Sequence, residues 1–352
     1  MVIYRGFMNA HPTGEPAAAD GGYEPLDLGK LLTGSLNIYR RHFGPLFVLF
    51  LLFQLPPLLI LMRYVYVLQW MQQAGWPFTV DLLPPTAEPS ALLGWGLALL
   101  VYWVLVFPFM FVVPARAAGL ALLGRPVRIG ECVKFARRRW WETQGSYALF
   151  GGLVILLYLL PLAVALLAAV EGLEVGAIVA AFFLLLVVSL ITIYLIFRVV
   201  PLDGAIAFDR PQGSYTRRVV SRLVHSFRLT RGTFWYVVGV MVVTWLLMAA
   251  ARYVVVTPLE WLLVVVALWL DVGEFNLLTF GLWQPPLWLL SAQIVLRTLG
   301  MVATLPFEYV VIGLLYFDLR FRREGLDIKL NLAKLADADA DELSVVETDT
   351  TY

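Results

Sequence analysis

Two charged side chains of opposite sign, Arg198 and Glu308, fall inside long apolar segments of the chain. A charge within a membrane segment is costly, so it is usually paired and often functional. When residues 199–200 are aligned with residues 310–311, which share the sequence Val-Val, Arg198 and Glu308 reach nearly the same depth. The pattern therefore predicts an ion pair. Its role is either to lock two helices together or to form an intramembrane polar site for a lipid headgroup or a proton.

Two acidic residues, Asp203 and Asp318, follow the inner ends of the same apolar segments. We expect these carboxylates to pair locally with Arg198, Arg320 or Arg322, since an unpaired charge near the membrane is unfavourable.

Other reactive side chains are few and scattered. The chain has one cysteine, Cys132, and three histidines, His11, His42 and His225. This excludes a disulfide framework and argues against a cysteine-based or histidine-cluster metal site. The sequence contains neither a phosphate-binding glycine loop nor a His-Glu-x-x-His, Gly-x-Ser-x-Gly or nucleic-acid-binding motif. We therefore expect no enzymatic activity, no cofactor and no nucleic-acid partner.

The composition predicts an all-α integral membrane protein. Hydrophobic residues make up 61% of the chain and charged residues 14%, with a mean hydropathy of +0.80. Segments of about 20 apolar residues can cross the hydrocarbon core. Six qualify: about 44–68, 91–114, 146–169, 175–201, 234–256 and 286–317.

Prolines and segment length add two expectations. Pro56-Pro57 lies inside the first predicted span and should kink or break it, because proline removes a backbone donor. The apolar run from Pro258 to Leu270 has only 13 residues. We expect it to lie at the outer interface or to re-enter the membrane, because it is too short to span.

Basic residues concentrate on one side of these six spans. If both termini share a side, that side carries 22 of the 26 Lys and Arg residues. The other four are Arg63, Arg198, Arg252 and Arg297. The positive-inside rule therefore predicts a multi-pass protein with both termini in the cytoplasm.

A charged, aromatic phrase precedes three of the predicted spans. It reads IYRRHF at 38–43, FARRRW at 135–140 and LTRGTF at 229–234, with copies about 95 residues apart. Val-Val-Pro or Val-Val-Ile recurs near the inner ends of the second, fourth and sixth spans, at 112–114, 199–201 and 310–312. Because each copy is followed by two spans, the chain returns to the side of the membrane from which it started. We therefore predict three parallel αα-hairpin repeats, each preceded by a cytoplasmic amphipathic interfacial helix.

Each phrase ends an amphipathic segment. Apolar residues at helical spacing form a stripe in the first segment (Leu28, Leu32, Leu36 and Tyr39) and in the third (Val220, Leu223, Val224 and Phe227). A helix with such a face and basic flanks should lie in the headgroup plane. The arginines that we expect to contact anionic lipid phosphates are Arg40, Arg41, Arg137, Arg138, Arg139, Arg222, Arg228 and Arg231.

The chain divides into a short leader, a membrane domain and a tail. Residues 1–25 lack the layout of a signal peptide and are predicted to be a flexible cytoplasmic leader. Residues 26–330 form the six-span domain, with repeats at about 26–125, 126–213 and 214–330. Residues 331–352 are acidic and poor in large apolar residues, which predicts a disordered cytoplasmic tail. The tail either solubilises this end or binds a basic partner.

Three stretches resemble a known family. They are residues 28–43 (LGKLLTGSLNIYRRHF), 226–234 (SFRLTRGTF) and 315–327 (LYFDLRFRREGLD). They are similar to the six-span membrane domain of membrane-anchored glycerophosphoryl diester phosphodiesterases, which also occurs in stand-alone bacterial proteins. The resemblance covers about residues 26–330 and implies a helical domain of the bacterial inner membrane. It implies no phosphodiesterase activity, because the 25 residues after Asp327 contain no histidine with which to build the catalytic barrel.

Two functions are compatible with these observations. The first is a non-enzymatic bacterial inner-membrane protein whose basic interfacial helices engage anionic lipids or organise a protein partner at the cytoplasmic face. The alternative is a transporter or lipid-translocating protein with an intramembrane polar site at Glu308 and Arg198. A polar cavity around Glu308 would favour the alternative, and a closed ion pair in a packed bundle would favour the first.

Overall fold

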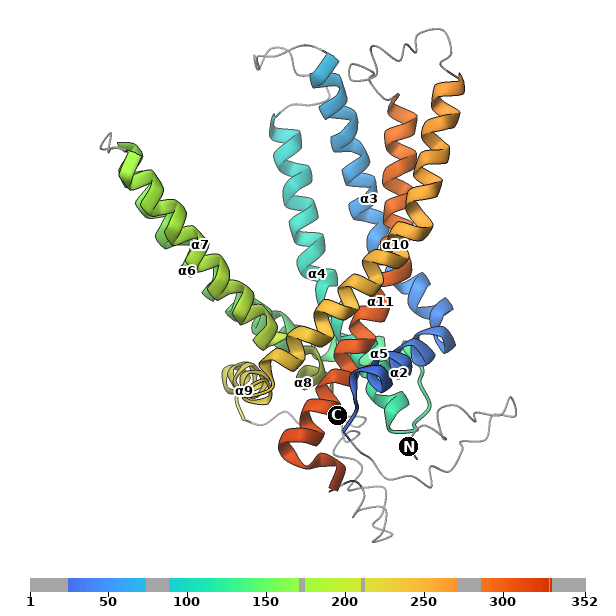
Figure 1. Ribbon diagram of the computed structural model, residues 1–352, viewed down its shortest axis with the longest axis vertical. Coiled ribbons are helices and arrows are strands. Elements are labelled where there is room, and N and C mark those ends of the chain that lie inside the picture. Colours follow the sequence, from blue (N-terminus) through green and yellow to red (C-terminus); the bar gives the residue numbers. More distant parts are fainter. Residues whose placement is uncertain are drawn as a thin grey trace. The chain divides into compact units, whose positions relative to one another are not determined.

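The computed structural model describes residues 25–73, 89–170, 175–209, 213–270, 286–328 and 330. Within these ranges the protein is all-helical and has no strand (Figure 1). The predicted leader, acidic tail and most of the outer loops lie outside the described residues.

Six helices are long and apolar enough to cross a membrane, which confirms the predicted number of spans. They are α3 (Phe43–Gln73), α4 (Pro89–Leu122), α6 (Trp140–Val170), α7 (Val175–Val199), α10 (Phe234–Leu270) and α11 (Leu287–Glu324). Each has a run of hydrophobic residues with no preferred polar face, as expected for a helix surrounded by lipid and other helices.

Shorter helices separate the long ones. A helix of 10 to 15 residues directly precedes each pair of long helices: α2 (Leu28–Arg41), α5 (Ile129–Arg138) and α9 (Tyr215–Leu229). A seven-residue helix, α8 (Leu202–Phe208), follows α7. Because each short helix ends within a few residues of the next long one, each copy of the charged phrase lies at a turn between them.

The prolines inside the long helices do not interrupt them. Residues 258–270 are not a separate interfacial or re-entrant segment, because α10 continues through Pro258 to Leu270 as one helix of 37 residues. At 1.5 Å per residue it is about 55 Å long, well beyond a hydrocarbon core of about 30 Å. Of the kink or break expected at Pro56-Pro57, a break does not occur, because α3 runs on to Gln73 as one helix.

The chain forms two compact units. Unit 1 contains residues 1–38, 111–242 and 310–352, and unit 2 contains residues 39–110 and 243–309. Unit 2 consists of the last three residues of α2, the whole of α3, most of α4, most of α10 and the first part of α11. Unit 1 contains α5 to α9 and the remaining parts of α2, α4, α10 and α11.

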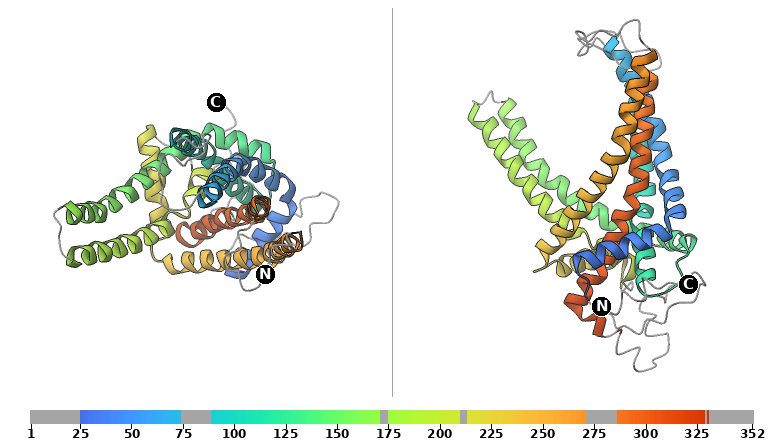
Figure 2. Two further views of the ribbon diagram at one scale, coloured as in Figure 1. Left: turned by 90° about the horizontal axis from the view of Figure 1, so that it is seen from above. Right: turned by 45° about the vertical axis from the view of Figure 1, so that its right-hand side comes forward.

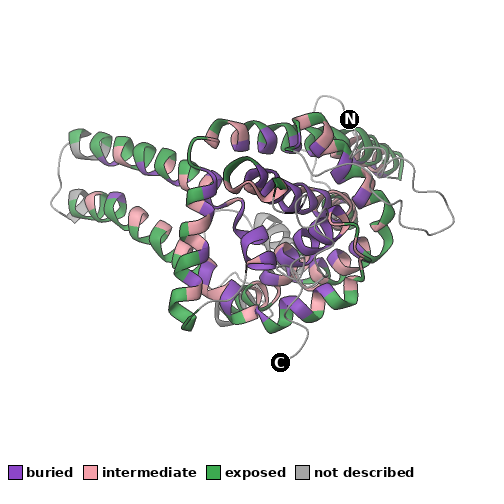
Figure 3. Ribbon diagram, turned by 90° about the horizontal axis from the view of Figure 1, so that it is seen from below, coloured by how far each residue is buried: buried purple, intermediate pink, exposed green. Residues whose placement is uncertain are grey.

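The core of unit 1 is made by three segments far apart in sequence: residues 112–120 of α4, the whole of α8, and residues 310–319 of α11. Every residue in these stretches is buried. Glycines permit the close approach, since a Cβ atom on Gly313 would lie 2.8 Å from the backbone of Ala115. In contrast, α6 and α7 lie side by side as a hairpin and expose most of their apolar side chains (Figures 2 and 3).

Candidate membrane-surface site

Most of the arginines predicted to contact lipid lie at the turns between short and long helices. We call these turns junction 1 (residues 38–43), junction 2 (135–141) and junction 3 (229–235). The structure divides these arginines into two groups. Six of the eight are exposed: Arg40, Arg41, Arg137, Arg138, Arg228 and Arg231. Arg139 and Arg222 are buried, and each has a partner inside unit 1.

Arg139 belongs to the interior, which corrects its assignment to a lipid contact. Its side chain donates from Nη1 to the carbonyl oxygens of Ile206 (2.7 Å) and Asp209 (2.9 Å). Arg116 donates to the neighbouring carbonyl of Ala207 at 2.9 Å. The last carbonyls of a helix lack intrahelical donors and carry partial negative charge. The two guanidinium groups therefore cap the end of α8.

An aromatic ring orders these two guanidinium groups. Arg116 lies 3.6 Å and Arg139 4.6 Å from the centre of the Phe135 ring. Cation–π contact of this kind stabilises a guanidinium group in an apolar setting. Phe135 therefore belongs to the packing of α8 and not to a lipid-facing surface.

Arg222 is likewise internal, with only 3% of its surface exposed. Its Nη1 lies 2.6 Å from Oε2 of Glu142, and Nη1 of Arg218 lies 2.7 Å from Oε1 of the same carboxylate. Glu142 is in the first turn of α6. Arg222 and Arg218 thus attach α9 to α6, and Arg222 is removed from the set of lipid contacts.

Each junction also presents an exposed aromatic side chain beside its exposed arginines. Phe43 at junction 1 is 41% exposed, Trp141 at junction 2 is 71% exposed and Trp235 at junction 3 is 80% exposed. Large aromatic residues flanked by arginine are typical of segments at a membrane–water interface. The three junctions share this chemistry although the residues themselves differ.

The short helices pack through a face different from the predicted apolar stripe. On α2 the buried residues are Leu31, Gly34, Ser35 and Ile38. On α9 they are Val219, Arg222, Ser226 and Leu229. The predicted stripe of α9 remains at least partly accessible, with Val220 and Val224 exposed. Each of these two helices therefore has one face against protein and a second, apolar face directed outward.

Arg198 and Glu308 each have partners within their own unit. In unit 1, Arg198 donates from Nε to the Tyr194 hydroxyl (2.9 Å) and from Nη1 to the Phe227 carbonyl oxygen (2.9 Å). In unit 2, the indole Nε1 of Trp245 donates to Oε1 of Glu308 at 2.6 Å. The ion pair between Arg198 and Glu308 stays a prediction.

The two aspartates differ in their surroundings. Asp318 is fully buried and pairs with Arg322, whose Nε lies 2.9 Å from Oδ2, as expected from the sequence. Its Oδ1 also accepts the backbone N–H of Leu26 at 2.7 Å. Asp203 is also buried, but it accepts a hydrogen bond from the Tyr147 hydroxyl. The two carboxylates thus tie different segments of unit 1 together.

A closed ring of five polar side chains, which sequence reasoning missed, joins α9, α11 and the residue after α8. His225 donates from Nδ1 to Oδ2 of Asp209 (2.6 Å) and from Nε2 to Oε1 of Glu324 (2.7 Å). Arg320 continues the ring, with Nε 2.7 Å from Oε2 of Glu324 and Nη1 3.1 Å from the Tyr316 oxygen. The Tyr316 hydroxyl closes it on Oδ1 of Asp209.

The ring holds His225 in its charged form. Burial alone would lower the pKa of this imidazole, but hydrogen bonds and negative charge from Asp209 and Glu324 outweigh burial and raise the pKa to about 9. Tyr316, Arg320 and Glu324 are spaced four residues apart, which places them on one face of a helix. The sequence could not reveal that His225 joins them, because His225 is 16 residues from Asp209 and 99 from Glu324. No group of three or more metal-ligating side chains is arranged to hold a metal ion in the described ranges.

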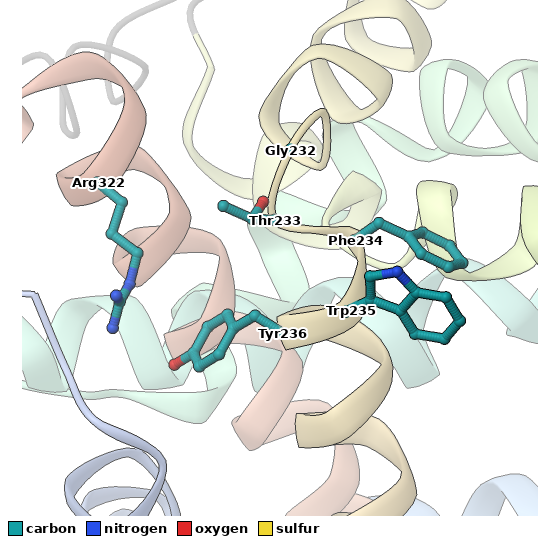
Figure 4. A pocket seen from close by; sticks show the side chains of 6 residues that line it. All are labelled: Gly232, Thr233, Phe234, Trp235, Tyr236 and Arg322. Carbon is teal, nitrogen blue, oxygen red and sulfur yellow. The ribbon is translucent and has the colours of Figure 1, made fainter.

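Junction 3 adjoins a hollow of about 430 Å³ (Figure 4). Residues 232–236 and Arg322 line it. The figure shows Thr233, Tyr236 and Arg322 on one side of the α10 backbone and the rings of Phe234 and Trp235 on the other. Arg322 lies 4.7 Å from the centre of the Tyr236 ring, and both side chains donate to the carbonyl oxygen of Leu26.

No family model matches this chain, and no curated protein or solved structure shows significant similarity to it.

Proposed function

We propose that this chain is a non-enzymatic protein of the bacterial inner membrane that binds anionic lipids through its three junctions. The observation that carries the proposal is the pairing of exposed arginine with an exposed aromatic ring at each turn between a short and a long helix. Arginine binds phosphate, and the aromatic ring favours the same interfacial depth. The resemblance to the membrane domain of glycerophosphoryl diester phosphodiesterases agrees with such a role and stays a prediction.

Three parallel repeats and cytoplasmic termini form part of this proposal. The residues eight positions before the aromatic that begins each long helix are Ser35, Cys132 and Ser226, and all three are fully buried. The residues five positions before it, Ile38, Phe135 and Leu229, are also buried. The same two positions of each short helix thus pack inward, which supports a common unit. Both termini would lie with the 22 basic residues on the cytoplasmic side.

Electrostatics give the expected strength of lipid binding. An arginine near an anionic surface contributes about 1 kcal/mol. Removing both exposed arginines of junction 1 (Arg40 and Arg41) or of junction 2 (Arg137 and Arg138) should therefore weaken its binding of anionic lipid by about 2 kcal/mol, or roughly 30-fold. The buried Arg139 and Arg222 should contribute to folding instead.

Native mass spectrometry of the full chain tests this proposal. Gently extracted wild-type protein is titrated with phosphatidylglycerol and, in parallel, with phosphatidylcholine. We expect preferential retention of phosphatidylglycerol, which should largely disappear when the six exposed arginines are changed to glutamine. Changing the same six to lysine serves as a matched control that keeps the charge. Equal retention of both lipids by the wild type, or no loss in the glutamine variant, would overturn the proposal.

The alternative, a transporter or lipid-translocating protein, draws on Glu308. This carboxylate lies within a candidate span and receives a hydrogen bond from Trp245. Intramembrane carboxylates are frequent in proton and substrate pathways. Proton-coupled uptake into proteoliposomes that Glu308→Gln abolishes would favour this alternative over the first function.

A further inference from the structure

The hollow at junction 3 has one arginine in its lining and others at the turn beside it, which favours the phosphate of a lipid headgroup. Arg322 lines the hollow directly. The Arg323 guanidinium lies close beside the position where a Cβ atom of Gly232 would be, and Arg231 precedes Gly232 in the chain and is exposed. The Arg322 and Arg323 side chains therefore lie at this edge of the hollow, and Arg231 belongs to the turn that forms it.

The buried negative charge beside the hollow has a partner. Asp318 is fully buried, and its carboxylate is paired with Arg322 and with the N–H of Leu26. Asp27 accepts the backbone N–H of Lys30 at the start of α2. Arg231 and Arg323 add two positive charges at this turn, which favours an anionic ligand.

The two aromatic residues at the start of α10 indicate the source of that ligand. Phe234 and Trp235 are the first residues of the candidate span Phe234–Leu270, and the Trp235 indole is largely exposed. Indole rings prefer the headgroup level of a bilayer. A hollow at this point of the helix would therefore lie where lipid phosphates are, with the hydrocarbon region beginning along α10.

The surrounding fold keeps the basic residues in place. Gly232 has φ of 79°, a left-handed conformation that glycine adopts without strain and that turns the chain between α9 and α10. The ring around His225 holds α9 against α11, the two helices that supply or adjoin the arginines. Arg322 is further fixed by Asp318. Preorganised guanidinium groups lose less entropy on binding phosphate.

We infer that this hollow binds the phosphate of one anionic phospholipid, with Arg322 in its lining and Arg231 and Arg323 at the adjoining turn. Trp235, on the other side of the α10 backbone, would hold the start of the helix at the headgroup level. The inference rests on the proposed function and adds to it a defined, saturable site at junction 3. The site is specific to junction 3, and we expect the exposed arginines of junctions 1 and 2 to bind lipid more diffusely.

The test uses the full chain and the double variant Arg231→Gln/Arg323→Gln, which leaves the Asp318–Arg322 pair intact. In native mass spectrometry with phosphatidylglycerol, we expect wild-type protein to keep one lipid under activation that strips the others. The double variant should lose that lipid and bind it at least tenfold more weakly. Arg137→Gln/Arg138→Gln is the matched control and should keep the tightly held lipid. Unchanged thermal unfolding of both variants would show that each is folded.

The outcomes separate the two proposals. If wild-type protein retains no anionic lipid preferentially, the proposed function fails. If it retains phosphatidylglycerol, but the Arg231→Gln/Arg323→Gln variant keeps the tightly bound molecule with unchanged affinity, only the site at junction 3 is wrong.

Inorganic phosphate and phosphatidylcholine are the two further ligands tested. Displacement of the retained lipid by millimolar phosphate would identify a free-phosphate site and overturn the assignment to lipid, and equal binding of phosphatidylcholine would overturn the selectivity for anionic headgroups.

Discussion

The Tyr102 hydroxyl donates to the carbonyl oxygen of Phe53 at 2.7 Å, and that oxygen is the acceptor that Pro57 leaves without its helical donor. In a regular helix the N–H of residue 57 would bond to the carbonyl of residue 53, but proline has no N–H. A side chain of α4 therefore replaces the missing backbone donor of α3. This contact helps to explain why α3 continues through Pro56 and Pro57, since freed backbone groups in membrane helices are satisfied by neighbouring helices.

Tyr102→Phe should destabilise the protein by about 1 kcal/mol, the usual range for a hydrogen bond between membrane helices. Thermal unfolding in detergent measures the change, and Tyr253→Phe, at an exposed tyrosine, is the control. A double-mutant cycle with Pro57→Ala sharpens the test, because alanine restores the backbone donor. Tyr102→Phe should lower the melting temperature less in the Pro57→Ala background than in the wild type. An identical decrease in both backgrounds would refute the explanation.

Gly313→Ala should destabilise unit 1 by about 1 to 3 kcal/mol through overpacking. The added methyl group would lie 2.8 Å from both Cα and the carbonyl oxygen of Ala115, and backbone atoms cannot rotate away as a flexible side chain can. Gly151→Ala is the matched control, because a methyl group at that position would meet no atom within 4 Å. It should be neutral or stabilise α6 slightly, since alanine is a better helix former than glycine. Equal melting temperatures for the two variants would contradict the close packing of α4 on α11.

The ring around His225 should make the stability of the protein depend on pH. The pKa of this imidazole is about 9 in the folded protein, against 6.5 for an unperturbed histidine. Because the folded protein binds this proton more tightly than the unfolded chain does, protonated His225 contributes its full stabilisation below pH 6.5. That contribution is lost as the pH rises from 6.5 through about 9. The loss should amount to at most about 3 kcal/mol. The groups that face the imidazole in the ring are Asp209 and Glu324, with Arg320 and Tyr316 bonded behind them.

Melting temperatures measured between pH 6 and 9.5 test this dependence. The decrease in melting temperature with rising pH should be much smaller in His225→Gln, which has no titrating imidazole at this position. His42→Gln is the control, because burial and then Arg41 lower the pKa of His42, so its titration acts in the opposite direction. A decline of the same size in wild type and His225→Gln would show that other groups govern the pH response.

Cross-linking tests the predicted pair of Arg198 and Glu308. In a Cys132→Ala background, Arg198→Cys with Glu308→Cys should cross-link efficiently with a short bifunctional reagent if the two positions are neighbours. Glu260 and Arg297 provide the positive control, since their side chains form an ion pair at 2.5 Å. If the control pair is captured and the other is not, Arg198 and Glu308 act separately, each with the partners found in its own unit.

The amino-acid sequence by itself determined the class of this protein and its six candidate spans. Membrane insertion depends on about 20 consecutive apolar residues, a local property that needs no knowledge of tertiary contacts. The same holds for the short helices before residues 43, 140 and 234, whose turns carry the charged, aromatic phrase. The prediction for the end of α10 was wrong because a composition pattern cannot show whether a helix continues through Pro258.

Only the tertiary structure decided which charges are internal. Arg138 and Arg139 are adjacent and chemically identical, yet Arg138 is exposed while Arg139 caps α8 through residues about 70 positions away. The ring around His225 has the same cause, since Glu324 is 99 residues from the imidazole it holds. Helix formation and apolar burial follow from neighbours along the chain, but the partner of a buried charge is set by which helices pack together. For that reason the basic phrases located the turns between short and long helices, and only the fold separated the arginines that face outward from those that hold the helices in place.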